Sequence, residues 1–113
     1  GMPTKVFVEL NMINGRFYEL KDLFIKNSHY VARLSKIIDE RIQTDPQYEY
    51  VFPGAYKGIK EDQPFYIDEN NLYIYFPPYE IGPYAAGFIT FEIPFSIIRD
   101  IIDKKGEFWL SFQ

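Results

Sequence analysis

The fold is decided by residues 62–95, which read DQPFYIDENNLYIYFPPYEIGPYAAGFITFEIPF. Residues 65–67 and 72–76 are β-forming, and the run between them, 68–71, consists of turn-forming side chains. This arrangement predicts a β-hairpin. Both faces of its second strand are apolar or aromatic, which indicates a central strand covered on both sides.

A proline-rich loop follows this hairpin. Pro77 and Pro78 cannot donate ladder hydrogen bonds and therefore end the second strand. After the loop, residues 87–93 alternate again between apolar and other side chains. They predict a third strand whose core-facing residues are Ile89, Phe91 and Ile93.

The chain before this region predicts another hairpin and a helix. Residues 6–12 alternate with a period of two, and Asn14-Gly15 suits a type I′ turn, so residues 16–20 return as a partner strand. Ser28 is the expected N-cap of a helix that runs to about Thr44. The helix ends at Asp45-Pro46, because proline disfavours an α conformation at the preceding residue. Its apolar side chains recur at helical spacing: Val31, Leu34, Ile37, Ile38 and Ile42.

The remaining segments complete an α+β fold. Residues 45–64 are irregular, with one short strand expected where Tyr48, Tyr50 and Phe52 alternate. Pro94 suits the first turn of a second helix that ends at Gly106, and residues 107–112 are expected to form a last strand. The predicted architecture is an antiparallel sheet built from hairpins with two helices packed on it, in a single domain of residues 1–113.

Composition narrows the function classes. The 113-residue chain carries 12 basic and 16 acidic residues, a formal net charge of −4, with no basic run that would bind a phosphate backbone. Nucleic acid is therefore not an expected partner. The apolar runs are too short for a membrane span, and no signal peptide is visible. The absence of cysteine excludes disulfides and thiolate sites.

Few residues can carry chemistry. His29 is the only histidine, with neither cysteine nor a second histidine to complete a metal site, so we assign it no role and expect no metal or cofactor. A small carbohydrate-active enzyme would pair Glu80 with Asp68 or Glu69 across a cleft. Residues 68–71 lack the glycine and distal glutamate of a calcium loop, so we interpret them as a turn.

The loop PPYEIGPYAAG, residues 77–87, most needs an explanation. Its three prolines restrict the backbone, and Tyr79 and Tyr84 are presented at a fixed spacing. A preorganised loop loses little entropy on binding, and tyrosine offers contact area with a polar tip. The loop is interpreted either as a rigid recognition surface for a protein or glycan, or as a crossover whose tyrosines cap the sheet. As a recognition surface, its candidate partner-binding residues are Pro78, Tyr79, Glu80, Pro83 and Tyr84.

The central stretch also resembles a known family. The runs DQPFYI (62–67), LYIYF (72–76), PYEIGPYAAG (78–87) and IPF (93–95) resemble the RsiV-like extracytoplasmic domain. The resemblance covers roughly residues 16–103 and is strongest over 62–95. That domain ends certain anti-sigma factors that sense lysozyme, and it is an accessory module in some bacterial cell-wall polysaccharide deacetylases.

The resemblance implies a non-catalytic binding or sensing module outside the cytoplasmic membrane, secreted or anchored at the cell surface. Its implied ligand is a lysozyme-like protein or a peptidoglycan component of the cell envelope. In the sensor proteins the contact surface includes the region that corresponds here to Pro78, Tyr79, Pro83 and Tyr84. A third hypothesis is a purely structural packing or dimerisation domain, which exposed apolar surface around Trp109 and Phe112 would support.

Overall fold

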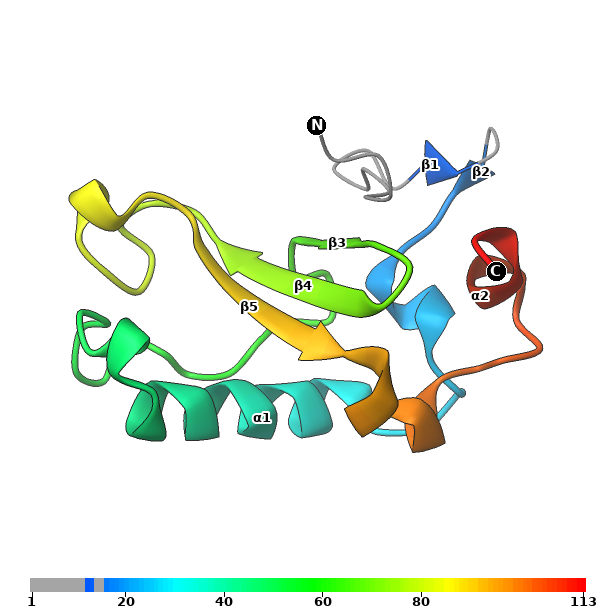
Figure 1. Cartoon of the computed structure of the whole chain (residues 1–113), viewed down its shortest axis with the longest axis horizontal. Helices are drawn as coiled ribbons and strands as arrows, with labels where there is room; N and C mark the ends of the chain where they lie inside the picture. Colours follow the sequence, from blue (N-terminus) through cyan, green and yellow to red (C-terminus); the bar gives the residue numbers. More distant parts are fainter. Residues whose placement is uncertain (1–11, 14–15) are drawn as a thin grey trace.

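The computed structural model describes residues 12–13 and 16–113 and shows a three-stranded sheet lying across one long helix (Figure 1). The strands of the sheet lie above helix α1, and the shorter C-terminal helix α2 lies beyond the right-hand end of the sheet. The strands and α-helices are β1 (Met12–Ile13), β2 (Arg16–Phe17), α1 (Tyr30–Thr44), β3 (Phe65–Ile67), β4 (Asn71–Phe76), β5 (Ile89–Pro94) and α2 (Glu107–Ser111). Five short 3₁₀ segments connect them: η1 (Leu20–Leu23), η2 (Pro46–Tyr48), η3 (Tyr84–Ala86), η4 (Phe95–Ile97) and η5 (Arg99–Ile101).

The sheet has the order β3-β4-β5, with both neighbouring pairs antiparallel. Its register places Tyr73 opposite both Tyr66 and Glu92. The predicted hairpin and the predicted third strand are therefore confirmed, and β4 is the central strand. Alternation gives the sheet one fully buried face, whose side chains are Phe65, Ile67, Leu72, Ile74, Phe76, Ile89, Phe91 and Ile93.

The other face of β4 carries half-buried tyrosines. Tyr73 stacks on Tyr66 with ring centroids 4.6 Å apart, and Tyr75 lies edge-on to Phe88 at 5.8 Å. Aromatic pairs of this kind stabilise a strand pair beyond the area that they bury.

Helix α1 begins two residues after the predicted N-cap. Its N-cap is His29 rather than Ser28, and His29 has a left-handed backbone with φ of 57°. Asn27 is also left-handed, so the chain turns sharply on both sides of Ser28, and no side chain caps the helix. The end at Thr44 is as predicted, and Leu34 and Ile38 are fully buried against the sheet.

The first hairpin is observed only near its turn. β1 pairs with β2 antiparallel, with Met12 opposite Phe17 and Ile13 opposite Arg16. Asn14-Gly15 and the predicted strand residues before Met12 lie outside the described residues. The return strand is shorter than predicted, because Leu20 is already in η1, where Asp22 accepts a hydrogen bond from the Glu19 backbone N–H.

Segment 45–56 contains no strand, contrary to the prediction for Tyr48, Tyr50 and Phe52. Asp45 accepts a hydrogen bond from the Gln47 backbone N–H and starts η2, which turns Tyr48 into the core. The Tyr48 hydroxyl then donates to the Thr90 carbonyl at 2.8 Å. The segment therefore contacts the edge of β5 through the Tyr48 side chain and not through strand pairing.

The second predicted helix is wrong in form. Residues 95–101 instead make the two 3₁₀ segments η4 and η5 on either side of Ile98. The buried residues Phe95, Ile98 and Ile101 recur every three positions, the period of a 3₁₀-helix. The chain then becomes extended at Ile102, because the Ile101 carbonyl accepts from the Ile25 N–H and the Asp103 N–H donates to the Leu23 carbonyl. These tertiary hydrogen bonds override the helical periodicity.

The predicted last strand is also wrong, because residues 107–111 form α2. Gly106, expected to stop a helix, is instead the N-cap of this one. Phe108 is buried, with its ring stacked on Tyr18 at 4.6 Å and 5°. Two α-helices packed with an antiparallel sheet still make the predicted α+β fold class correct. None of the helices in the described part of the chain is long and apolar enough to span a membrane.

Candidate functional site

The proline-tyrosine loop, defined as residues 77–88, connects β4 to β5 at the left-hand end of the sheet (Figure 1). Three local backbone hydrogen bonds fold it. The Glu80 N–H donates to the Pro77 carbonyl at 3.2 Å, the Ala86 N–H to the Pro83 carbonyl at 2.9 Å, and the Gly87 N–H to the Tyr84 carbonyl at 2.9 Å. Since the prolines also fix φ, the loop has little conformational freedom left to lose.

The middle of this loop is anchored in the core. The Ile81 side chain is buried, and its carbonyl accepts a hydrogen bond from the Phe52 N–H at 2.8 Å. A Cβ atom at Gly82 would lie 2.7 Å from the Ile89 Cδ1 atom, so any side chain here would force the end of the buried Ile89 side chain to move. The loop is therefore held at Ile81 and Gly82, and the parts on either side of these two residues project.

Two tyrosines lie on the projecting parts. Tyr79 is 70% exposed and Tyr84 64% exposed, and their ring centroids are 5.2 Å apart with the planes tilted by 37°. Tyr79 has a φ of 74°, a left-handed conformation that costs a non-glycine residue about 1–2 kcal/mol. Strained backbone of this kind concentrates at binding sites, where the surrounding structure imposes it.

The other predicted site residues accompany this pair. Pro78 and Pro83 are half-buried beside the tyrosines, and Pro83 is the N-cap of η3. The Glu80 carboxylate is exposed and has neither a hydrogen-bond nor an ion-pair partner in residues 16–113. The loop thus gathers all five predicted residues in one projection.

Three further exposed aromatic residues are not assigned to the site by the sequence. Phe52 is 43% exposed and Tyr50 38% exposed, and both lie next to the base of the loop, whereas Phe88 follows Gly87 at its end. The alternation of Tyr50 and Phe52 predicts a strand, and that interpretation conceals their exposure. The only available signal is the density of aromatic residues in segment 45–56.

The geometry contradicts a carboxylate pair between Glu80 and the β3–β4 turn. Asp68 and Glu69 precede β4, whereas Glu80 follows it, and the six residues of this strand span about 20 Å. Glycosidases place their two carboxyl groups no more than about 9.5 Å apart. The pairing of Glu80 with either turn residue is therefore wrong.

Asp68 has a structural role in the turn. Its Oδ1 accepts hydrogen bonds from the backbone N–H groups of Asn70 and Asn71, and its Oδ2 accepts one from the Tyr73 hydroxyl at 2.6 Å. Partial burial acts to raise the pKa of Asp68, but these hydrogen bonds outweigh it and hold the pKa below its ordinary value. Burial, followed by the bond to Asp68, raises the pKa of Tyr73 to about 12.

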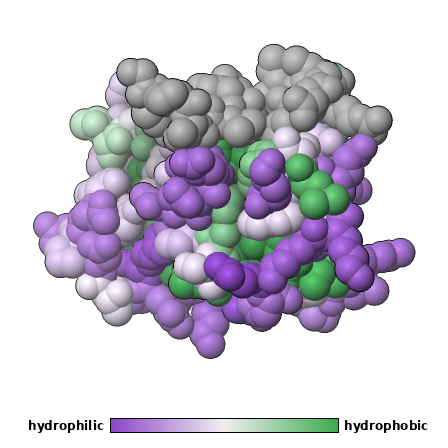
Figure 2. Space-filling view, turned by 45° about the vertical axis from the view of Figure 1, so that its right-hand side comes forward, coloured by the Kyte–Doolittle hydropathy of each residue, from purple (hydrophilic) through white to green (hydrophobic). Residues whose placement is uncertain are grey.

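Trp109 and Phe112, whose exposure would support a packing or dimerisation domain, are packed on the core. No group of three histidine or carboxylate side chains in the described residues is arranged to hold a metal ion. Trp109 and Phe112 are half-buried and pack on the buried Phe95 with ring centroids 5.1 and 5.8 Å away. Figure 2, which turns the right-hand side forward, shows polar side chains around smaller apolar areas on that side.

The fold and the loop define a small α+β domain that presents a constrained aromatic projection. Residues 21–96 match the family described as "Protein of unknown function (DUF3298)", and the chain belongs to that family. It is 30% identical over 105 residues to the anti-sigma-V factor RsiV of Bacillus subtilis (strain 168). The match covers 85% of this chain and 36% of that relative. The resemblance to RsiV-like domains is therefore confirmed.

A solved structure is similar in fold. A crystal structure of a DUF3298 family member from Bacteroides fragilis NCTC 9343 superposes with a TM-score of 0.66 and 19% sequence identity. The match covers 88% of this chain and 41% of the other. The chain thus spans about two fifths or less of the length of both relatives.

Proposed function

We propose that this chain, acting as one domain, is a non-catalytic module outside the cytoplasmic membrane that binds or senses a protein through the proline-tyrosine loop. Its homology to an anti-sigma factor, a class of proteins that act by binding other proteins, supports a sensing role. The family resemblance makes a lysozyme-like protein the first ligand to test and a soluble peptidoglycan fragment the second.

The observation that carries this proposal is the pair of exposed tyrosines on a constrained loop. Tyr79 and Tyr84 leave most of their ring surface in solvent although the loop base is anchored through Ile81. Capping of the sheet, the other interpretation of the loop, would require these rings to be buried. Tyrosine anchors contribute strongly to protein interfaces because they bury a large area at a low cost in side-chain entropy.

The test is a titration of the isotope-labelled chain with lysozyme and, separately, with soluble peptidoglycan fragments, followed by amide chemical shifts. We expect saturable shifts centred on residues 79–87 with lysozyme. The double variant Tyr79→Ala/Tyr84→Ala should weaken binding at least tenfold while its urea midpoint stays unchanged, since neither ring supports the core. Leu110→Ala, at an exposed apolar residue on α2, is the matched control and should bind normally.

Shifts with the glycan alone would reassign the ligand class. Saturable binding that the tyrosine variant retains would remove the loop from the site. Absence of shifts with either ligand would overturn the proposed function.

A further inference from the structure

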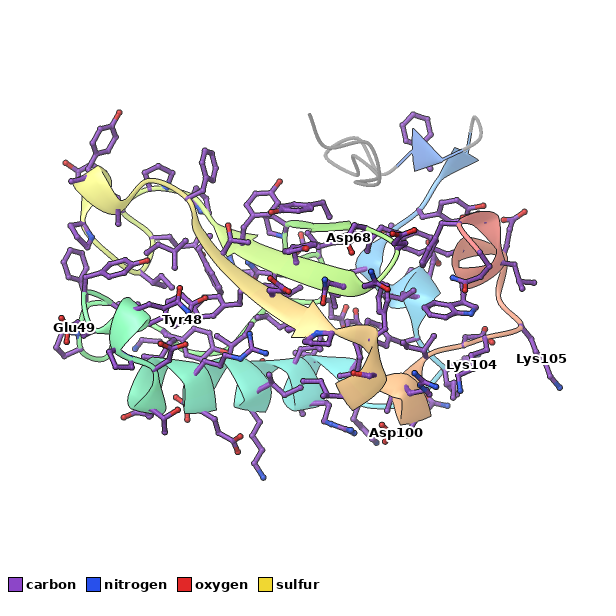
Figure 3. The ribbon with its side chains drawn as sticks, viewed as in Figure 1. Tyr48, Glu49, Asp68, Asp100, Lys104 and Lys105 are labelled. Atoms are coloured by element: carbon purple, nitrogen blue, oxygen red, sulfur yellow. The ribbon has the colours of Figure 1, made fainter. Side chains whose placement is uncertain are left out.

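Residues 49–52 lie beside the proline-tyrosine loop although 25 or more residues separate the two in the chain. The Phe52 N–H donates to the Ile81 carbonyl at 2.8 Å, and a Cβ built on Gly82 would approach the Tyr50 ring to 3.6 Å. Figures 1 and 3 show both segments at the left-hand end of the molecule. Tyr50 and Phe52 therefore extend the aromatic surface begun by the loop.

The two segments at this end carry charge of one sign, and the nearest arginine, Arg41 of α1, lies beside Asp45 and Tyr48. Residues 45–56 and 77–88 contain no lysine or arginine, whereas they contain three carboxylates. Asp45 is engaged with Gln47, but the exposed carboxylates of Glu49 and Glu80 have no hydrogen-bond or ion-pair partner within residues 16–113. Glu49 points outward at this end, and Lys104 and Lys105 lie at the opposite end of the molecule (Figure 3).

We propose that residues 49–52 are the second half of the recognition surface, and that the partner is a protein presenting lysine or arginine side chains to it. This inference rests on the proposed function and adds to it a second contact segment and the charge of the partner. A guanidinium or ammonium group gains from both an aromatic face and a nearby carboxylate. Carboxylates at the rim of an interface also accelerate the association of a basic partner.

The division of roles follows from position. Tyr50 and Phe52 are less exposed than the loop tyrosines, so they form the base of the surface on which a partner side chain is buried. Glu49 comes from residues 49–52 and Glu80 from the proline-tyrosine loop, so each of the two segments contributes one carboxylate. Removing either the aromatic rings or the carboxylates should weaken binding without unfolding the chain, because none of the four side chains belongs to the buried core.

The experiment measures the affinity and association rate of lysozyme, a basic protein, for three variants of the full chain. Phe52→Ala should weaken binding about tenfold, as the loss of an interface aromatic does. Glu49→Gln/Glu80→Gln should slow association about fivefold at low salt and have little effect at high salt, because mobile ions screen exposed charges. Glu69→Gln, at an exposed carboxylate in the β3–β4 turn, is the matched control and should leave the affinity and the association rate unchanged.

A second arm tests the partner's charge directly. Acetylation of the lysine side chains of lysozyme removes their charge and should weaken binding to the wild-type chain but change little for the Glu49→Gln/Glu80→Gln variant. Glu49→Lys, at a position where the fold is indifferent to charge, should weaken binding more than Glu49→Gln.

The outcomes separate the two proposals. If Tyr79→Ala/Tyr84→Ala weakens binding while Phe52→Ala and both glutamate changes do not, the proposed function stands and the second segment is refuted. If acetylated lysozyme binds as well as the native protein, the basic character of the partner is refuted. No binding of lysozyme to the wild-type chain would overturn both.

Discussion

Replacing Gly82 by alanine should destabilise the fold through a single contact. The added Cβ would lie 2.7 Å from the Ile89 Cδ1 atom, whereas carbon atoms in contact normally lie about 3.5–4.0 Å apart. One of the two groups must therefore move by about 1 Å. Ile89 is buried in the sheet face and cannot swing aside without displacing its neighbours.

The magnitude follows from two opposing effects. Overpacking of this kind costs about 1–3 kcal/mol. Alanine also reduces the backbone freedom of the unfolded chain, which stabilises the folded state by roughly 0.5 kcal/mol. This gain applies at Gly82 because its φ is not positive and alanine is not strained there. The free energy of unfolding should fall by about 1.5 kcal/mol, or roughly 6 °C in the melting temperature.

A double-mutant cycle with Ile89→Val isolates the contact, because valine lacks the Cδ1 atom. Ile89→Val alone should cost about 1 kcal/mol. In the double variant the alanine methyl occupies the vacated space, so the total loss should stay below about 1 kcal/mol and the coupling energy should be at least about 1.5 kcal/mol in magnitude. Urea unfolding at constant m-value measures all four corners.

The control cycle pairs Ile89→Val with Gly54→Ala, where the added Cβ meets nothing within 4 Å and the cost comes from backbone strain at a φ of 75°, which Ile89 does not affect. That pair should be additive. A coupling below about 0.5 kcal/mol for the Gly82 cycle, equal to that of the Gly54 cycle, would refute the close packing of the loop on Ile89 as the reason for glycine at this position.

Three further outcomes are expected. Because the pKa of Asp68 is lowered in the folded state, its contribution to stability is present above the ordinary value of 3.8 and is lost as pH falls through the folded pKa. The stability difference between wild type and Asp68→Asn should therefore shrink on acidification, and a constant difference would contradict the hydrogen-bonded turn. The pKa of Tyr73 is raised to about 12, so its contribution is present below pH 10 and is lost as pH rises through 12. Burial also raises the pKa of Tyr56 to about 12, so Tyr73→Phe should remove one of two late-titrating phenols from the absorbance titration. Tyr48→Phe leaves the Thr90 carbonyl without its donor and should cost about 1 kcal/mol in urea unfolding, whereas Tyr79→Phe, at an exposed ring, should cost nothing measurable.

The sheet was predictable because its strands obey a strict period of two. Ile89, Phe91 and Ile93 alternate with polar side chains. The turn before β4 is predicted by Asp68 and the asparagines that follow it. Local sequence and final structure agree there. The same holds for the end of α1 at Asp45-Pro46.

Residues 95–112 were mispredicted because they satisfy more than one pattern. The isoleucines of residues 97–102 fit a helical stripe, but hydrogen bonds to Leu23 and Ile25, more than 70 residues earlier, hold the backbone extended at Ile102. Aromatic density in residues 107–112 favours a strand, yet the spacing of Phe108 and Phe112 is helical, and a stack on Tyr18 selects the helix. Contacts this distant leave no local signal.

The candidate site was predictable in composition but not in presentation. Prolines and tyrosines marked the loop, whereas the exposure of Tyr79 and Tyr84 depends on how Ile81 is anchored. The positive φ of Tyr79 has no signal in the sequence, since no glycine or asparagine stands there. The neighbouring segment with Tyr50 and Phe52 joins the loop only through the folded chain.

The side chains along the outer edge of β5 have a consequence for how these molecules behave at high concentration. The Tyr48 hydroxyl and the Arg41 guanidinium donate to the carbonyls of Thr90 and Glu92, the groups that an incoming strand would use. A second molecule cannot extend the sheet there without displacing both donors. The outer edge of β5 is thereby protected against strand-to-strand polymerisation. Loss of Tyr48 should appear first as faster aggregation of concentrated samples.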